Sequence, residues 1–195
     1  MTALLSMAAF ALASSISPGP VNVVALSAGA QHGLAASMRH VTGATVGFTV
    51  LLLLIGLGLH ELLTHFPNLI VVVKWAGVGF LLYMAYKLAV DNGRLGADQS
   101  TQGPSYAHGA AMQWLNPKAW LASLAGMGVY AADGGGQLVW QFTIVYFVIC
   151  YLSIASWAYA GTFLRKYLQE PQRVRVFNRV MAALLAASAL YLLVD

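Results

Sequence analysis

The sequence predicts an all-α integral membrane protein, a bundle of six membrane-spanning helices. Three observations support this fold class. First, 59% of the 195 residues are hydrophobic and only 8% are charged, whereas a soluble domain carries roughly a quarter charged residues. Second, the mean hydropathy is +0.72, and apolar windows of about twenty residues, long enough to cross a bilayer, recur along the chain. Third, two of these windows contain an internal proline, which predicts broken helices.

The apolar segments follow one another with short connections, and the longest polar stretch is only Asp91–Ser105. We therefore expect one polytopic membrane domain over residues 1–195, with half-repeats at about 1–90 and 107–195 and a linker at about 91–106. The six expected spans are Ala3–Ala30, Val41–Leu59, Leu69–Leu88, Ala107–Tyr130, Leu138–Leu164 and Val176–Val194.

The first expected break lies in the middle of the first span and consists of Ser17, Pro18, Gly19 and Pro20. Each proline lacks the N–H that would bond the carbonyl four residues earlier. The carbonyls before the break therefore lose helical partners, at several kcal/mol each unless they face protein or water. After the break, the free N–H groups of the half-helix and the Asn22 amide are suited to receive a carboxylate. The alternative is a structural kink whose freed groups bond to Ser14, Ser15 or neighbouring helices.

A similar break interrupts the fourth span, where Pro117 lies 99 positions after Pro18. A polar residue precedes each proline, Asn116 in one case and Ser17 in the other. Each break falls in the first span of a three-span half. Because three is odd, the halves must cross the membrane in opposite senses, which predicts an inverted repeat with two broken first helices. Paired breaks of this kind indicate a solute-binding site near the midplane.

Lys118 is the charged residue of the second break. Counting from Ala107 it lies about eleven residues into the span, roughly 16 Å at the helical rise, where a cation is costly and cannot easily reach the interface. It can receive a substrate carboxylate or exchange a proton during a transport cycle. Alternatively, it is a structural lysine bonded to the carbonyls freed by the opposite break. Gln113 and Asn116 are three residues apart and share a helix face, so we expect them to line the same cavity.

The distribution of charge predicts the orientation in the membrane. The loops after spans two and four contain Glu61 and Asp133 and no Lys or Arg. Because basic loops stay in the cytoplasm, we expect both termini on the outer side. A basic cluster also suits anionic lipid headgroups, and its placement in loops argues against a nucleic-acid partner. Eight of the ten basic residues fall in the loops after spans one, three and five: Arg39, Lys87, Arg94, Arg165, Lys166, Arg173, Arg175 and Arg179.

The residues of a catalytic centre are missing from the expected spans. There is no Ser/His/Asp set and no pair of intramembrane carboxylates, so we do not expect an enzyme. Cys150 is the only cysteine, which excludes an internal disulfide. His60, Glu61 and His65 provide too few ligands for a metal site, and no cofactor is expected.

Other spans contain charged, glycine and aromatic residues outside the two breaks. Lys74, in the third span, is expected to extend its ammonium to the outer interface, and His40 is expected at the inner interface. The Gly43 and Gly47 pair permits close helix packing and therefore permits, without requiring, a homodimer. The fifth span is unusually polar and aromatic, and spacing does not show which of its residues line a pathway: Tyr146, Tyr151, Ser153, Ser156, Trp157 and Tyr159.

These motifs resemble those of the LysE/RhtB family of amino-acid exporters. The resemblance implies a small inner-membrane exporter of amino acids or related metabolites, driven by the proton gradient. It extends over the length and the six spans, and the residues that carry it are Ser17, Pro18, Gly19, Pro20, Asn22, Gly29, Gly33, Gly43, Gly47 and the run from Trp114 through Asn116, Pro117 and Lys118 to Trp120.

The sequence departs from this family at Phe48, where many members carry an aspartate. No carboxylate remains within the expected spans, so the coupling residue is not identified and a neutral or weakly apolar amino acid is the expected substrate. Two alternatives to an exporter remain. One is a passive channel for a small solute or ion, and the other is a membrane scaffold without transport activity.

Overall fold

The computed structural model describes residues 2–59, 67–90, 103–131, 136–168 and 170–194, and every element in these ranges is helical. The predicted all-α class is therefore confirmed. The elements are α1 (Thr2–Ile16), α2 (Pro20–His32), α3 (Leu34–Leu54) with a π-helical turn η1 (Ile55–Leu59), α5 (Pro67–Ala89), α6 (Tyr106–Trp114), α7 (Pro117–Tyr130), α8 (Gly136–Arg165) and α9 (Pro171–Val194).

Within the described ranges, two helices are long and apolar enough to cross a membrane. They are Leu34–Gly58 and Gly136–Arg165, and α1 with α2 makes a third if this pair, bent by 63°, is one broken span. Length and composition thus support a membrane protein. The 63° bend is what the two prolines of the first break predict, because they interrupt the helical hydrogen bonds.

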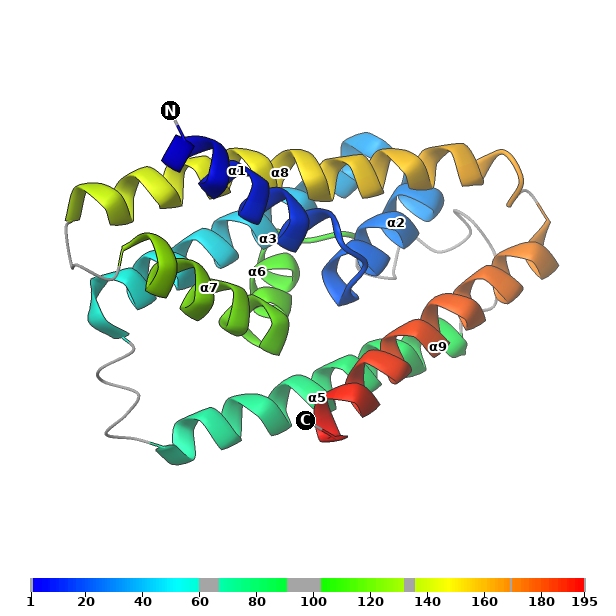
Figure 1. Cartoon of the computed structure of the whole chain (residues 1–195). Helices are drawn as coiled ribbons and strands as arrows, with labels where there is room; N and C mark the ends of the chain where they lie inside the picture. Colours follow the sequence, from blue (N-terminus) through cyan, green and yellow to red (C-terminus); the bar gives the residue numbers. More distant parts are fainter. Residues whose placement is uncertain (1, 60–66, 91–102, 132–135, 169, 195) are drawn as a thin grey trace.

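The longest helix, α8, runs along one side of the molecule, opposite α5 and α9 (Figure 1). Both α1 and α2 pack along α8, and α3 packs against α8 and α6. The helices α5 and α9 pack on each other and run together along one side of the molecule (Figure 1). The main core contains residues from every described helix, and its largest buried side chains include Phe142, Tyr146 and Leu51.

Two helices, α3 and α9, begin at least five residues earlier than the sequence predicts. The second span was expected from Val41, but α3 starts at Leu34, directly after Gly33, whose positive φ of 80° ends α2. His40 therefore lies within a helix and is 1% exposed, buried against the other helices. The last span was expected from Val176, but α9 starts at Pro171, because proline is well suited to the first helical position.

The glycines of α3 allow it to approach α6 closely. A Cβ on Gly43 would collide with the backbone of Tyr106, and one on Gly47 would come within 2.6 Å of the Cα of Ala110. From the other side, a Cβ on Gly109 would collide with the carbonyl of His40. The glycine pair is thus used in packing within the chain, and a homodimer would have to use another surface.

This crossing makes a stability prediction. We expect Gly43→Ala to destabilise the purified protein by about 1–3 kcal/mol, because the added methyl must push two backbones apart. The matched control is Gly79→Ala in α5, where a Cβ has no neighbour within 4 Å. The stability of both variants is measured by thermal unfolding in detergent, monitored as the loss of the monodisperse peak. Equal stability of the two variants would contradict the close crossing.

Several predictions fall on residues outside the described ranges. These are most of the linker at about 91–106 with Arg94, the group His60, Glu61 and His65, Asp133, and the side chain of Lys74. Among the described residues, no group of three or more His, Cys, Asp and Glu side chains is placed to hold a metal ion.

Candidate functional site

Both helix breaks occur where the prolines predict them. The first lies between Ile16 and Pro20, and the second between Trp114 and Pro117. Pro20 and Pro117 each open the helix that follows, a position where the missing N–H costs nothing. At the second break Asn116 caps α7, since its side-chain oxygen accepts a 3.2 Å hydrogen bond from the Lys118 N–H.

Each carbonyl released by the first break has a donor within the protein. The Ser14 carbonyl accepts from the Ser17 hydroxyl at 3.2 Å, and the Ile16 carbonyl accepts from the Trp157 indole at 3.0 Å. The Asn22 amide donates to the Ser15 and Ser17 carbonyls at 2.8 and 2.9 Å. Backbone groups that cannot bond to lipid are thus satisfied by side chains.

Asn22 therefore has a structural task that the sequence did not reveal. It was expected to offer its amide to a solute, but the Nδ2 donors are directed at the two backbone carbonyls. The side chain is 5% exposed, so the loss of these bonds would leave buried carbonyls without partners. For the Asn22 amide, the structural alternative is the better description: a kink whose freed carbonyls are hydrogen-bonded by the protein itself.

Lys118 joins the two breaks. Its Nζ donates to the Ser17 hydroxyl at 2.7 Å, to the Ser17 carbonyl at 3.1 Å and to the Pro18 carbonyl at 3.5 Å. These bonds are those expected of a structural lysine that bonds to the carbonyls freed by the opposite break. Lys118 is nevertheless only half-buried and lines a cavity, so its ammonium is also placed to meet a solute.

The cavity lies at the junction of the two breaks. Its volume is about 40 Å³, roughly three times the minimum for one water molecule. Five residues expected at the site line it: Gly19, Asn22, Gln113, Asn116 and Lys118. The other four do not. Ser17 and Pro18 bond to Lys118, and Pro20 and Pro117 begin α2 and α7.

The remaining walls come from residues outside the expected site set, and of these Tyr146 was named among the candidate pathway residues of the fifth span. Three of them, Tyr146, Cys150 and Ile154, are spaced by four along α8 and so share one face. That spacing was visible in the sequence, but apolar residues at helical spacing usually indicate a core. The full set of these further lining residues is Ser14, Ser15, Val21, Phe48, Ala119, Ala122, Tyr146, Cys150 and Ile154.

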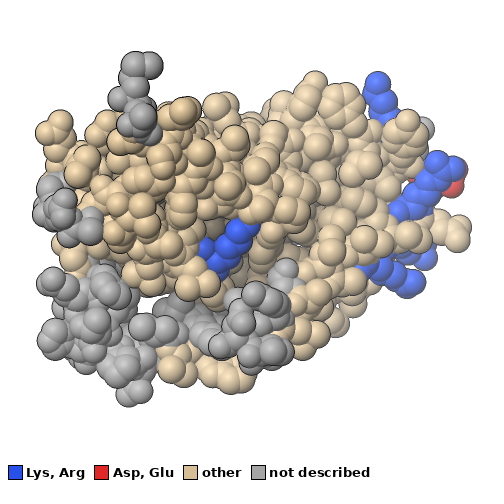
Figure 2. Space-filling model, viewed as in Figure 1, with Lys and Arg blue, Asp and Glu red and all other residues tan. Residues whose placement is uncertain are grey.

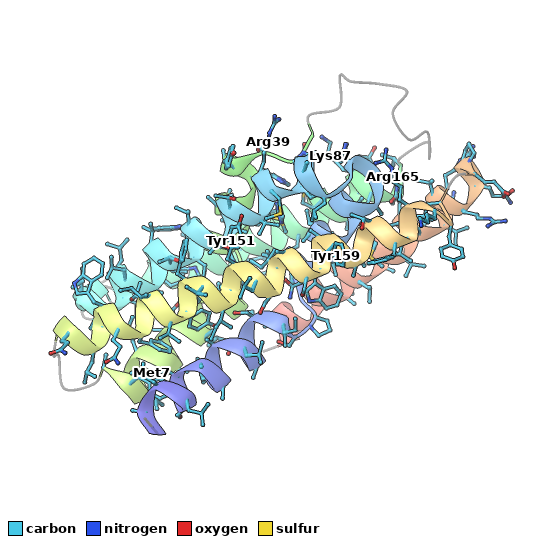
Figure 3. The ribbon with its side chains drawn as sticks, turned by 90° about the horizontal axis from the view of Figure 1, so that it is seen from above. Met7, Arg39, Lys87, Tyr151, Tyr159 and Arg165 are labelled. Carbon is cyan, nitrogen blue, oxygen red and sulfur yellow. The ribbon has the colours of Figure 1, made fainter. Side chains whose placement is uncertain are left out.

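Figure 3 shows other aromatic residues of α8, with Tyr151 and Tyr159 labelled along this helix. Tyr159 is 53% exposed and pairs edge-on with Phe163 at 4.9 Å. Only Tyr146, of the α8 aromatics singled out in the sequence, lines the cavity.

The chemistry of the cavity favours an anionic group beside a small apolar one. The N–H groups of Val21 and Asn22, in the first turn of α2, have no acceptor among the described residues. Such groups at a helix N-terminus attract a carboxylate, and the Lys118 ammonium adds a full positive charge. None of the lining residues is Asp or Glu. The opposite wall is apolar, with the rings of Phe48 and Tyr146 in contact at 4.5 Å.

Comparison with known proteins identifies the family of the chain. A family model described as LysE type translocator matches residues 12–195. The chain is similar to proteins named cysteine/O-acetylserine efflux protein. The one from Klebsiella pneumoniae subsp. pneumoniae is 25% identical over 189 residues, covering 95% of this chain and 94% of the relative. The one from Escherichia coli O1:K1 is 26% identical and covers 92% of each. No solved structure matches the chain.

Proposed function

Because the chain belongs to the LysE type translocator family, we propose that it exports a small neutral amino acid across the bacterial inner membrane in exchange for protons. Family membership makes the chain a membrane translocator and not an enzyme, and its similarity to the efflux proteins supports an amino acid as the substrate. The observation that carries the finer proposal is the cavity at the two helix breaks, with one ammonium and no carboxylate in its wall.

The substrate's size and charge follow from this wall. The carboxylate of an amino acid would approach Lys118 and the free N–H groups of α2, displacing the Ser17 contacts of the lysine. Its ammonium would be met by carbonyl, hydroxyl and amide oxygens such as those of Ser14 and Gln113. A second positive charge on the substrate would have no counter-charge. Cysteine and O-acetylserine, the substrates in the relatives' names, fit these limits.

The proposed architecture is a single domain of six spans, arranged as two inverted halves. The first half would comprise α1 to α5 and the second α6 to α9, with each broken first helix reaching the central cavity. The two halves have the same order of elements, which supports this proposal: each begins with a broken helix pair and continues with two long helices. Alternating access would then result from one set of helices rocking against the other around the cavity.

The positions of the basic residues support an orientation with both termini on the periplasmic side. Figure 3 shows Arg39, Lys87 and Arg165 close together on one side of the bundle, with Met7 towards the other end. Arg165 also reaches Gly33, at the turn between α2 and α3. In the view of Figure 2, basic side chains gather at the end where α8 finishes and α9 begins. This end would face the cytoplasm.

The exposed apolar side chains would contact lipid. Leu57, Val72, Trp75 and Leu152 are all at least 60% exposed, which suits a surface that faces hydrocarbon. A homodimer would bury part of this surface, since Gly43 and Gly47 already pack against α6.

The test is radiolabelled amino-acid flux into proteoliposomes with and without an imposed pH gradient. We expect accumulation of cysteine, O-acetylserine or another small neutral amino acid when the gradient is present, and its collapse when a protonophore is added. Lysine serves as the cationic comparison and should be transported poorly, because the cavity offers no carboxylate.

Three results would contradict the proposal. Flux that no gradient can drive uphill would indicate a passive channel, and preferred transport of lysine would contradict the neutral substrate. The absence of flux with every amino acid, together with stoichiometric co-purification of another protein, would indicate a scaffold.

A further inference from the structure

His40 is a buried histidine with one ring nitrogen left open. Its Nε2 lies 3.4 Å from the carbonyl oxygen of Val21. Because a carbonyl only accepts, the hydrogen of the neutral ring is on Nε2 and the lone pair is on Nδ1. This Nδ1 is buried and has no hydrogen-bond partner among the described residues. An unpartnered buried acceptor is costly in a packed protein, and on an imidazole it is a site for a proton.

A second histidine lies between His40 and the surface. The ring of His108, in the first turn of α6, is 6.4 Å from the ring of His40 between centroids, and the two rings are tilted by 50°. The Nε2 of His108 is 3.1 Å from the Met84 sulfur in α5. His108 is half-buried whereas His40 is 1% exposed. His108 is therefore the more exposed neighbour of a buried acceptor.

His40 is also connected to the cavity. Its hydrogen bond ends on Val21, which is in the first turn of α2 and lines the cavity. A positive ring would strengthen this bond, because charge-assisted hydrogen bonds are about twice as strong as neutral ones. The protonation of His40 would thus alter the turn of α2 whose N–H groups face the substrate.

We propose that His40 binds the proton that is exchanged for the substrate, and that His108 relays it to the cytoplasmic side. This inference rests on the proposed function, in which export is driven by the proton gradient, and it names the residues that the function needs. When the cavity faces outward, Nδ1 of His40 takes up a proton. When the cavity faces inward, the proton leaves through His108 and the substrate carboxylate enters. Each cycle moves protons inward and substrate outward.

The charged groups around the pair are consistent with release on the cytoplasmic side. Towards His40, α6 contributes His108, and α2 contributes only the Val21 carbonyl. On the α5 side, Lys87 acts electrostatically on His108, and Arg39 is exposed next to His40 in α3. The titratable residues of α8 that face α3 meet it beyond His40, towards the C-terminal end of α3. Tyr146 faces Phe48 there, and Cys150 faces Thr45. No described carboxylate faces either histidine.

The experiment separates coupling from transport in proteoliposomes loaded with the dye pyranine, which reports internal pH. Radiolabelled cysteine is followed in two assays, counterflow at equal pH and accumulation under a gradient of one pH unit. The wild-type protein should accumulate about tenfold, the ratio that one coupled proton sustains across this gradient. His40→Gln, which keeps a donor for Val21, should retain counterflow, accumulate nothing and give no pyranine signal. His108→Gln should slow the proton signal.

The matched control is His32→Gln, an exposed histidine at the end of α2, which should behave as wild type in both assays. Wild-type accumulation and pyranine signal in His40→Gln would overturn the inference and leave the exporter intact. Loss of counterflow in both His40→Gln and His40→Asn would assign His40 to the fold and would also overturn it. The absence of counterflow in the wild-type protein, with cysteine and with O-acetylserine, would instead refute the proposed function.

Discussion

Replacing Lys118 by alanine is expected to reduce export by about 10- to 100-fold while membrane yield stays at the wild-type level. The loss of a charge-assisted hydrogen bond to a substrate carboxylate costs about 1.5–3 kcal/mol, which corresponds to this range. The fold should persist because Lys118 is only half-buried, and because the Ser17 carbonyl keeps its 2.9 Å hydrogen bond from Asn22. Initial rates of amino-acid flux in proteoliposomes measure the effect.

Two further variants determine whether charge or bonding matters. Lys118→Gln can still donate to Ser17, so its failure to export would show that the positive charge is needed. Lys166→Ala removes an exposed lysine just after α8 and should export at the wild-type rate. Undiminished export by Lys118→Ala would remove this lysine from the binding site and leave it the purely structural role suggested by its three bonds at the first break.

Replacing Asn22 by alanine is expected to destabilise the fold itself. The variant leaves the Ser15 carbonyl without its donor and the Ser17 carbonyl with Lys118 alone. Each buried carbonyl without a partner costs about 1–3 kcal/mol, and no lipid group can replace the amide. We expect a lower unfolding temperature in detergent and a reduced yield of monodisperse protein.

Thr49→Ala is the matched control for Asn22→Ala. The Thr49 hydroxyl also donates to a carbonyl, that of Thr45, at 2.8 Å. This carbonyl lies inside α3, where the backbone already provides a helical partner, so the loss of the hydroxyl should cost little. If Asn22→Ala unfolds at the same temperature as Thr49→Ala, the first break does not depend on the asparagine.

The helix breaks were predictable because their cause is local. A proline removes a hydrogen-bond donor wherever it stands. Pro18 and Pro20 therefore determine where α1 ends and α2 begins, and Pro117 determines where α7 begins, without reference to the rest of the chain. The family was predictable for the same reason, since its motifs are short and contiguous, and the family model over residues 12–195 confirms it. The start of α3 was not predictable in this way. The polar residues around His40 are typical of a loop, and only the packing of α6 against them buries them within a helix.

The class, the breaks and the amino-acid exporter family were therefore determined by the sequence alone, through composition and through the chemistry of single residues. The tertiary structure decided which groups meet. Lys118 reaches Ser17 across 101 positions of the chain, and Trp157 reaches Ile16 across 141. The walls of the cavity and the open nitrogen of His40 depend on such distant pairings. Each residue's own preferences are compatible with many partners, and only the packing of the helices selects one.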